Sequence, residues 1–126
     1  MKPDKIKLRK DGKSLELSFP GAEAQALSAE MLRVHSPSAE VKGHGPGQEV
    51  LQWGKLNVAI TAIERSGNYA IRLTFDDGHD TGIYSWDYLY DLCVNAERHW
   101  QVYLDKLQQA GKTRDPQVQV VKFMEP

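Results

Sequence analysis

Cysteine is almost absent from this chain of 126 residues, in which Cys93 is the single example. One cysteine cannot form a disulfide within the chain, so the sequence fits a reducing compartment, and we expect a cytoplasmic protein. One thiolate also cannot supply the several sulfur ligands of a structural zinc site or an iron–sulfur cluster. The scarcity of cysteine therefore excludes disulfide-stabilised proteins and thiolate-rich metal proteins as classes.

Long apolar runs and an excess of charge of one sign are also missing. No stretch approaches the roughly 18 apolar residues that cross a membrane, and the first residues do not lead into the apolar core of a signal peptide. The formal net charge is −1, so the charge balance predicts no binding to nucleic acid or to an anionic membrane. We expect neither as a partner.

The length predicts one domain over residues 1–126, with its core at about 5–111 and a C-terminal tail at 112–126. A hydrophobic share of 40% and a charged share of 26% are typical of a globular protein. A chain of this size can bury a core without disulfides or metal ions, so neither is needed for folding.

Alternating apolar and polar residues predict a first antiparallel hairpin. Residues 5–9 and 14–19 flank Asp11-Gly12, a dipeptide that strongly favours a two-residue turn. That turn places Ile6 opposite Leu17, so the apolar residues share one face. The pattern and the turn therefore agree on one register.

A second group of strands follows later in the chain. The strands are predicted at 58–63, 69–75 and 80–84. A four-residue loop between the first two would place Ile60 opposite Leu73. After Asp77-Gly78, a three-residue loop or a bulge would place Ile83 opposite Leu73.

Serine caps predict two helices. Ser28 precedes a short helix over 29–34, and Ser85 begins a long helix over 85–110 that Gly111 ends. An apolar stripe at helical spacing predicts that the long helix covers the sheet. The stripe consists of Trp86, Leu89, Cys93, Ala96, Trp100, Tyr103, Leu104 and Leu107.

Together these elements predict an α+β fold. We expect a small antiparallel twisted sheet, built from the hairpins, with the short helix and the long C-terminal helix packed on a face. Residues 116–123 give a weak further strand signal. Residues 37–54 resemble a loop and include the glycine- and proline-rich window 42–48. Ordered loops of this length are uncommon and are usually either functional or mobile, and we expect a binding surface there.

Known catalytic motifs are absent from the sequence. It has no glycine-rich phosphate loop, no serine elbow and no His-Glu-x-x-His. The acidic run Asp76, Asp77 and Asp80 lacks calcium-loop spacing and suits a tight turn. Cys93 falls on the buried stripe, with no neighbour placed to lower its pKa, which indicates an inert thiol. We therefore expect no enzyme activity.

Three histidines, His35, His44 and His79, are candidate metal ligands. A zinc, nickel or iron(II) site needs about that many. His35 and His44 lie across a loop-like segment whose geometry the spacing does not fix. Two interpretations stay open: a metal site built from the three with a carboxylate, or polar loop residues without a metal.

Two regions of the chain resemble a known family. Residues 32–41, LRVHSPSAEV, precede the turn FDDGHD at 75–80 and the helix start SWDYL at 85–89. Together they resemble the N-terminal domain of gamma-butyrobetaine hydroxylase and trimethyllysine dioxygenase, and the small stand-alone bacterial domains of unknown function related to it. The resemblance covers about residues 14–111. It implies no dioxygenase activity, because the iron(II) and 2-oxoglutarate sites belong to a separate jelly-roll domain.

The resemblance also implies a metal site. In those dioxygenases this domain carries a structural zinc held by three cysteines and one histidine. The resemblance places the cysteine positions at Ser36, Ser38 and Val41, and the histidine at His79. Because serine is a poor zinc ligand and valine is none, we expect no cofactor, with zinc or iron as the open alternative. We expect His79 to hydrogen-bond into the Ser36–Ser38 region instead.

The function we expect is a non-catalytic binding or adaptor module, a monomer or weak homodimer with an unidentified protein partner. Related domains are fused to P-loop scaffold ATPases that carry iron–sulfur clusters, which implies a role in metallocofactor or oxygenase-related biology. The alternative is a metal-binding protein that uses His79 with His35 and His44. The expected binding surface consists of Ser36, Ser38, Lys42, Gly43, His44, Asp77, Gly78 and Trp86.

Overall fold

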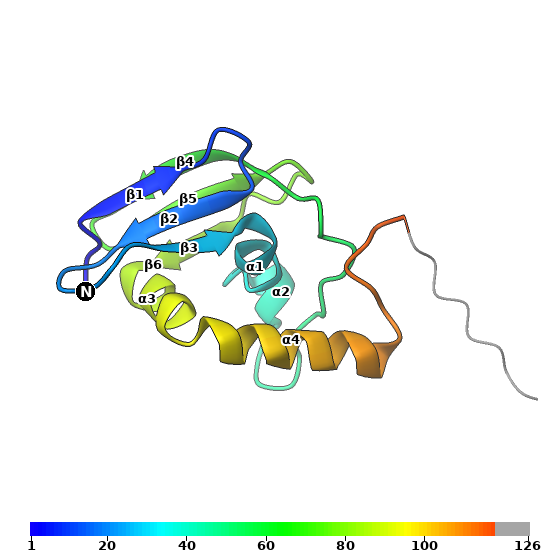
Figure 1. Cartoon of the computed structure of the whole chain (residues 1–126). Coiled ribbons are helices and arrows are strands. Elements are labelled where there is room, and N and C mark those ends of the chain that lie inside the picture. Colours follow the sequence, from blue (N-terminus) through cyan, green and yellow to red (C-terminus); the bar gives the residue numbers. More distant parts are fainter. Residues whose placement is uncertain (118–126) are drawn as a thin grey trace, which may run out of the picture.

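A computed structural model describes residues 1–117 of the chain (Figure 1). Within these residues the strands form two antiparallel three-stranded sheets. The first contains β1 (Lys5–Leu8), β2 (Ser14–Ser18) and β3 (Gln25–Ser28), and the second contains β4 (Ile60–Ser66), β5 (Ala70–Phe75) and β6 (Gly82–Ser85). The helices are α1 (Ala29–Val34), α2 (Ala39–Lys42), α3 (Trp86–Val94) and α4 (Ala96–Ala110). The predicted α+β class is confirmed, and the strand predicted over 116–123 lies largely outside the described residues.

The two sheets share one hydrophobic core. Leu15 and Leu17 of β2 are buried in the same cluster of apolar side chains as Leu73 and Phe75 of β5. Figure 1 shows the first sheet in front of the second, with α3 beside β6 and α4 running below α1 and α2. The antiparallel strands that the sequence predicted are therefore divided between two layers.

The first hairpin has the predicted register. Ile6 pairs with Leu17 across the Asp11-Gly12 turn. Gly12 has a φ of +71°, and its carbonyl accepts a 2.8 Å hydrogen bond from the amide of Ile60. A side chain on Gly12 would collide with the backbone of the second sheet. The turn therefore also fixes one sheet against the other.

The predicted register of the second hairpin is wrong. Ile60 pairs with Phe75 and Ile63 pairs with Leu73, because the pairing shifts between Ile60 and Ala62. Residues three apart face opposite sides of a regular strand, whereas one extra residue in a bulge lets Ile60 and Ile63 both pack on the core. Alternation of side chains could not reveal this bulge.

The predicted register of β6 is also wrong. Leu73 pairs with Gly82 instead of Ile83. Gly82 and Tyr84 are buried, whereas Ile83 is 51% exposed. The hydroxyl of Tyr84 donates a hydrogen bond to the carbonyl of Leu32 inside the core. A satisfied tyrosine therefore takes the buried position that the pattern assigned to isoleucine.

The helix predicted over 85–110 is divided at Asn95 into α3 and α4. The side-chain amide of Gln25 donates a 2.6 Å hydrogen bond to the carbonyl of Cys93. In a continuous helix that carbonyl would accept a hydrogen bond from the backbone amide four residues later. Gln25 takes the place of that donor and so stabilises the break. Ser85 caps α3, and Gly111, with a φ of +66°, ends α4 as predicted. In the described part of the chain, no helix is long and apolar enough to cross a bilayer.

The segment between α1 and β4 contains α2, which the sequence did not predict. Gly43, with a φ of +74°, packs directly against the backbone of Gln48 and closes the loop after α2. The amide of Val50 then donates a 2.8 Å hydrogen bond to the carbonyl of Val41. These contacts hold the segment against α2 as an ordered part of the surface.

Candidate functional site

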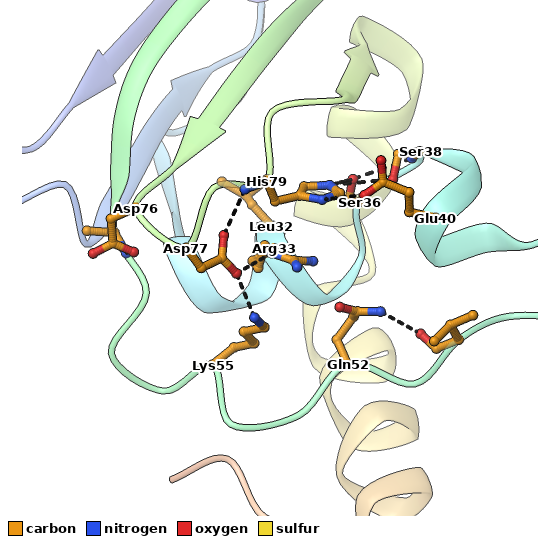
Figure 2. A network of polar contacts seen from close by, with 12 residues as sticks. Leu32, Arg33, Ser36, Ser38, Glu40, Gln52, Lys55, Asp76, Asp77 and His79 are labelled. Carbon is orange, nitrogen blue, oxygen red and sulfur yellow. Dashed lines mark hydrogen bonds and ion pairs between the residues drawn. The ribbon is translucent and has the colours of Figure 1, made fainter. Parts of the chain in front are cut away.

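The candidate site is built around His79, which the turn after β5 holds inside the protein. The amide of Phe75 donates to the carbonyl of His79 at 2.9 Å, and the amide of His79 donates to Oδ1 of Asp77 at 3.1 Å. The His79 side chain is 3% exposed. Figure 2 shows its ring pointing toward Ser36 and Ser38. The turn therefore buries the imidazole instead of presenting it to solvent.

Two serines between α1 and α2 contact the imidazole. Nε2 of His79 lies 2.8 Å from Oγ of Ser36 and 3.4 Å from Oγ of Ser38. Ser36 is completely buried. A β-carbon on Gly82 would lie 2.5 Å from its Oγ, so the backbone of β6 covers the hydroxyl. The predicted hydrogen bonding of His79 to the Ser36–Ser38 region is confirmed.

The other imidazole nitrogen faces a carboxylate. Oε2 of Glu40 lies 3.3 Å from Nδ1 of His79, and the hydroxyl of Thr81 donates to Oε1 at 3.1 Å. In the neutral ring Nδ1 therefore carries the proton and Nε2 accepts from Ser36. Serine, histidine and carboxylate in this order resemble a hydrolase triad, which the sequence did not predict. Because Ser36 has no exposed surface, a substrate cannot reach its Oγ, and the arrangement is structural.

The surroundings of His79 favour the neutral imidazole. Burial lowers the pKa of His79 below its ordinary value, and the charge of Arg33 lowers it further, against the opposing effect of Glu40. A neutral ring has one donor and one acceptor, and the contacts with Glu40 and Ser36 use both. His79 is therefore suited to join two segments of the chain by hydrogen bonds.

An ion cluster beside His79 was missed at the level of sequence. Nε of Arg33 donates to Oδ2 of Asp77 at 2.8 Å, and Nζ of Lys55 donates to the same oxygen at 2.6 Å (Figure 2). Burial alone would raise the pKa of Asp77, but the hydrogen bonds from Lys55, the His79 amide and Arg33 lower it to about 2. The carboxylate therefore joins α1, the turn and the segment before β4. The available signal was the arginine of the Leu-Arg pair in the family resemblance.

The structure does not bring His35 and His44 to His79. Nδ1 of His35 donates to the carbonyl of Met31 at 2.8 Å, and its ring lies 5.7 Å from the ring of His99 on α4. His44 is exposed in the loop after α2. Among residues 1–117, no three His, Cys, Asp or Glu side chains are grouped to hold a metal ion.

The residues predicted as a binding surface occupy different depths. Lys42, Gly43 and His44 form the outer end of α2 and its following loop, and Asp77 and Gly78 form the turn. Ser36 and Ser38 are buried beneath them.

Trp86, predicted in the same surface, is buried as well. It is 6% exposed, and its Nε1 donates a 3.0 Å hydrogen bond to the carbonyl of Asn68. The satisfied indole nitrogen explains how this tryptophan can belong to the core.

A groove lies between this segment and α4, and we call it the α2–α4 groove. It encloses about 450 Å³. Its lining includes the buried Val34, Val41 and Tyr103, together with the exposed Val50 and Val102. The hydroxyl of Tyr103 donates to the carbonyl of Gln52 at 2.8 Å, which fixes the width at one end. The groove is therefore a formed feature of the fold.

Comparison with known protein families shows to which family the chain belongs. The family described as gamma-butyrobetaine hydroxylase-like, N-terminal, matches residues 6–90. The chain belongs to this family. Comparison with curated proteins gave no match.

Solved structures agree with membership of the gamma-butyrobetaine hydroxylase-like N-terminal family. Two NMR solution structures of proteins are similar to this chain. One is 52% identical, with 98% of each chain covered and a TM-score of 0.81; the other is 48% identical, with 98% of this chain and 93% of that chain covered and a TM-score of 0.76. A crystal structure of a protein with unknown function of the DUF971 family, from Acidithiobacillus ferrooxidans, is 31% identical over 72% of this chain and 91% of its own, with a TM-score of 0.59.

The zinc that the family resemblance implies does not fit this family member. The groups that face Nε2 of His79 are the hydroxyls of Ser36 and Ser38, and Val41 has no donor atom. Zinc sites of proteins use thiolates, imidazoles and carboxylates, and a neutral hydroxyl is a much weaker ligand. Here the lone pair of Nε2 is already used by a hydrogen bond from Ser36. The donor set therefore favours a metal-free junction.

Proposed function

We propose that this family member is a non-catalytic binding module that holds a protein partner on the surface formed by α2 and residues 43–52. The α2–α4 groove carries this proposal, because it gives the surface a formed apolar depression with polar edges. Binding sites in proteins have this composition. This surface lies within residues 37–54, the loop-like segment in which the sequence predicted a binding surface.

The chemistry around His79 supports a binding role over a catalytic one. Ser36 is within hydrogen-bond distance of a histidine base, yet it is fully buried under Gly82. The thiol of Cys93 is also buried, and burial raises its pKa to about 11, which keeps it protonated and unreactive at neutral pH. Neither Ser36 nor Cys93 is therefore available as a nucleophile.

The family supports the context of the proposal. A match to a domain described as gamma-butyrobetaine hydroxylase-like favours partners among iron-dependent oxygenases or proteins that assemble metallocofactors, including iron–sulfur clusters. This part of the proposal rests on analogy between family members. Identification of the partner tests it.

Site-specific photo-cross-linking tests the proposal. A photo-reactive amino acid replaces His44, which is exposed on the proposed surface, and in a matched control it replaces Lys10, which is exposed on the first hairpin. In native cells we expect a discrete adduct from position 44 and none from position 10. Mass spectrometry identifies the partner, and the complex is then rebuilt from purified proteins. Equal adducts from both positions, or none from either, would contradict the proposal.

A further inference from the structure

The α2–α4 groove has a second property besides its shape, which is an excess of positive charge: two lysines and one glutamate are the charged residues among those that line it. Lys42 lies at the end of α2, and Lys106 lies on α4, and both line the groove. Neither forms an ion pair among the described residues. Lys42 instead lies 5.1 Å from the centre of the Tyr88 ring. Two ammonium groups therefore flank an apolar floor, and neither is held in a salt bridge within residues 1–117.

One carboxylate, Glu49, also lines the groove and is exposed. Backbone hydrogen bonds at Glu49 itself and at Gly47 lower the pKa of its carboxyl, and Lys106 and Lys42 contribute less. His35 at the same end of the groove is held neutral, because burial lowers its pKa. The groove therefore keeps a local excess of positive charge at neutral pH.

The dimensions of the groove suit a chain segment. On the α4 side its lining runs from Val102 to Ala110, a distance of about 12 Å at 1.5 Å per residue. On the other side it is lined by residues 49–52. An open channel of this length between a helix and an extended segment matches the mode in which apolar side chains of a peptide enter a groove and its charged residues meet the edges.

We infer that the α2–α4 groove binds a protein segment in which apolar residues are flanked by carboxylates. The apolar side chains lie on Val34, Val41 and Tyr103, and the carboxylates face Lys42 and Lys106. This inference rests on the proposed function and specifies its partner. A basic segment would be repelled by Lys42 and Lys106, and an uncharged segment would gain no charge pair with them, so both would bind less well.

Two synthetic peptides test the inference on the full chain by NMR titration. One is acetyl-Glu-Leu-Val-Phe-Leu-Glu-amide, and the other has both glutamates replaced by lysine. We expect the acidic peptide to shift the amide signals of Leu51, Val102 and Lys106, and to bind about fivefold more tightly than the basic one, as two exposed charge pairs allow. Equal binding of both peptides, or shifts confined to other surfaces, would overturn the inference.

Paired variants assign the binding to the groove. Lys106→Glu should weaken the acidic peptide about fivefold, whereas Lys5→Glu on β1 should leave it unchanged. Val102→Ser should weaken both peptides, whereas Val94→Ser on α3, which removes a valine of similar exposure, should not. If the control variants weaken binding as much as the groove variants, the inference is wrong.

One other candidate occupant of the groove must be distinguished from a protein partner. It is the end of this chain, which contains Phe123 and Glu125. If the wild-type chain binds neither peptide but Phe123→Ser binds the acidic one, the occupant belongs to this chain and the inference of a partner is overturned. If the peptides fail on all variants while the photo-reactive residue at position 44 still cross-links to a partner, the inference fails and the proposed function stands. If both experiments fail, both are wrong.

Discussion

Nε2 of His79 lies 2.8 Å from Oγ of Ser36, and this contact joins the turn after β5 to the segment between α1 and α2. Both side chains are buried, so the contact is shielded from water. Where the family resemblance implies a zinc ion between these two segments, this chain has a direct hydrogen bond. In this chain the contact uses a neutral imidazole, whose Nε2 accepts from Ser36 and whose Nδ1 faces Glu40, so the junction should respond to pH.

Loss of the imidazole should destabilise the protein. His79→Ala removes the hydrogen bonds to Ser36 and Ser38 and leaves the buried hydroxyl proton of Ser36 without its acceptor, for which we expect a loss of about 2–3 kcal/mol in the free energy of unfolding. Urea denaturation followed by circular dichroism measures the change. His44→Ala is the matched control, because His44 is exposed, and it should change the free energy by less than about 0.5 kcal/mol. Equal effects of the two variants would contradict the structural role of His79.

The stability of the protein should fall as the pH drops below about 6.5. Burial lowers the pKa of both His79 and His35 in the folded protein, so the unfolded chain binds protons that the folded chain does not. Stability from these groups is complete above the pKa of the unfolded state and is lost as the pH falls toward the folded values. Urea midpoints between pH 8 and pH 5 measure the slope. His79→Gln, which cannot titrate, should reduce the slope, and an unchanged slope would contradict the assignment.

The carboxylate of Asp77 should stabilise the fold down to low pH. Its pKa of about 2 lies below that of an unfolded aspartate, so its contribution is present above about pH 4 and is lost as the pH falls toward 2. Asp77→Asn leaves the buried Arg33 without its anion, and we expect a loss of about 1–2 kcal/mol at pH 7, since the site is partly open to solvent. Thermal unfolding measures it. Asp80→Asn, on an exposed residue of the same loop, should be neutral.

Removal of metal should leave the wild-type protein unchanged. Because Ser36, Ser38 and Val41 offer no thiolate to a metal beside His79, we expect the same melting temperature with and without a strong chelator. A variant with Ser36→Cys, Ser38→Cys and Val41→Cys has the ligand set that the family resemblance implies. It should bind one zinc ion per chain, in a colorimetric assay, and melt at a lower temperature after chelation. Stoichiometric metal in the wild-type protein would contradict the metal-free junction.

Local patterns were sufficient for the parts of the fold that depend on neighbouring residues. The Asp11-Gly12 turn and the alternation around it predicted the pairing of Ile6 with Leu17, which the structure confirms. The bulge near Ala62 and the break at Asn95 were not predictable in the same way. The break between α3 and α4 is accompanied by a contact between distant parts of the chain, the hydrogen bond from Gln25 to the carbonyl of Cys93, and the bulge leaves no mark in the alternation of side chains.

The candidate site, like the fold, could be predicted only in part. The contact of His79 with Ser36 and Ser38 could be predicted, because a family motif places these positions together. The ion cluster of Arg33, Asp77 and Lys55 was missed, since opposite charges distant in sequence have many possible partners. The α2–α4 groove was missed because a concave surface exists only after the helix and the segment beside it have packed.

The absence of a side chain at Gly82 should be as important for the stability of the protein as the presence of Ser36. A β-carbon there would lie 2.5 Å from Oγ of Ser36 and 3.0 Å from a ring carbon of Tyr84, both of them fully buried. Gly82→Ala should therefore lower the free energy of unfolding by about 1–3 kcal/mol through overpacking, as measured by urea denaturation. Gly45→Ala is the matched control, because a β-carbon at that position has open space around it.

A second substitution identifies the cause of the effect at Gly82. Ser36→Ala removes the Oγ atom that the new methyl group would strike, at the cost of the hydrogen bond to His79. If the clash with Ser36 is responsible, the double variant should be more stable than the sum of the two single changes predicts, by about 1 kcal/mol. Strict additivity would instead assign the loss to Tyr84 or to the backbone of β6. If the coupling is found, the glycine at the first position of β6 is what leaves room for the Ser36 hydroxyl beside His79.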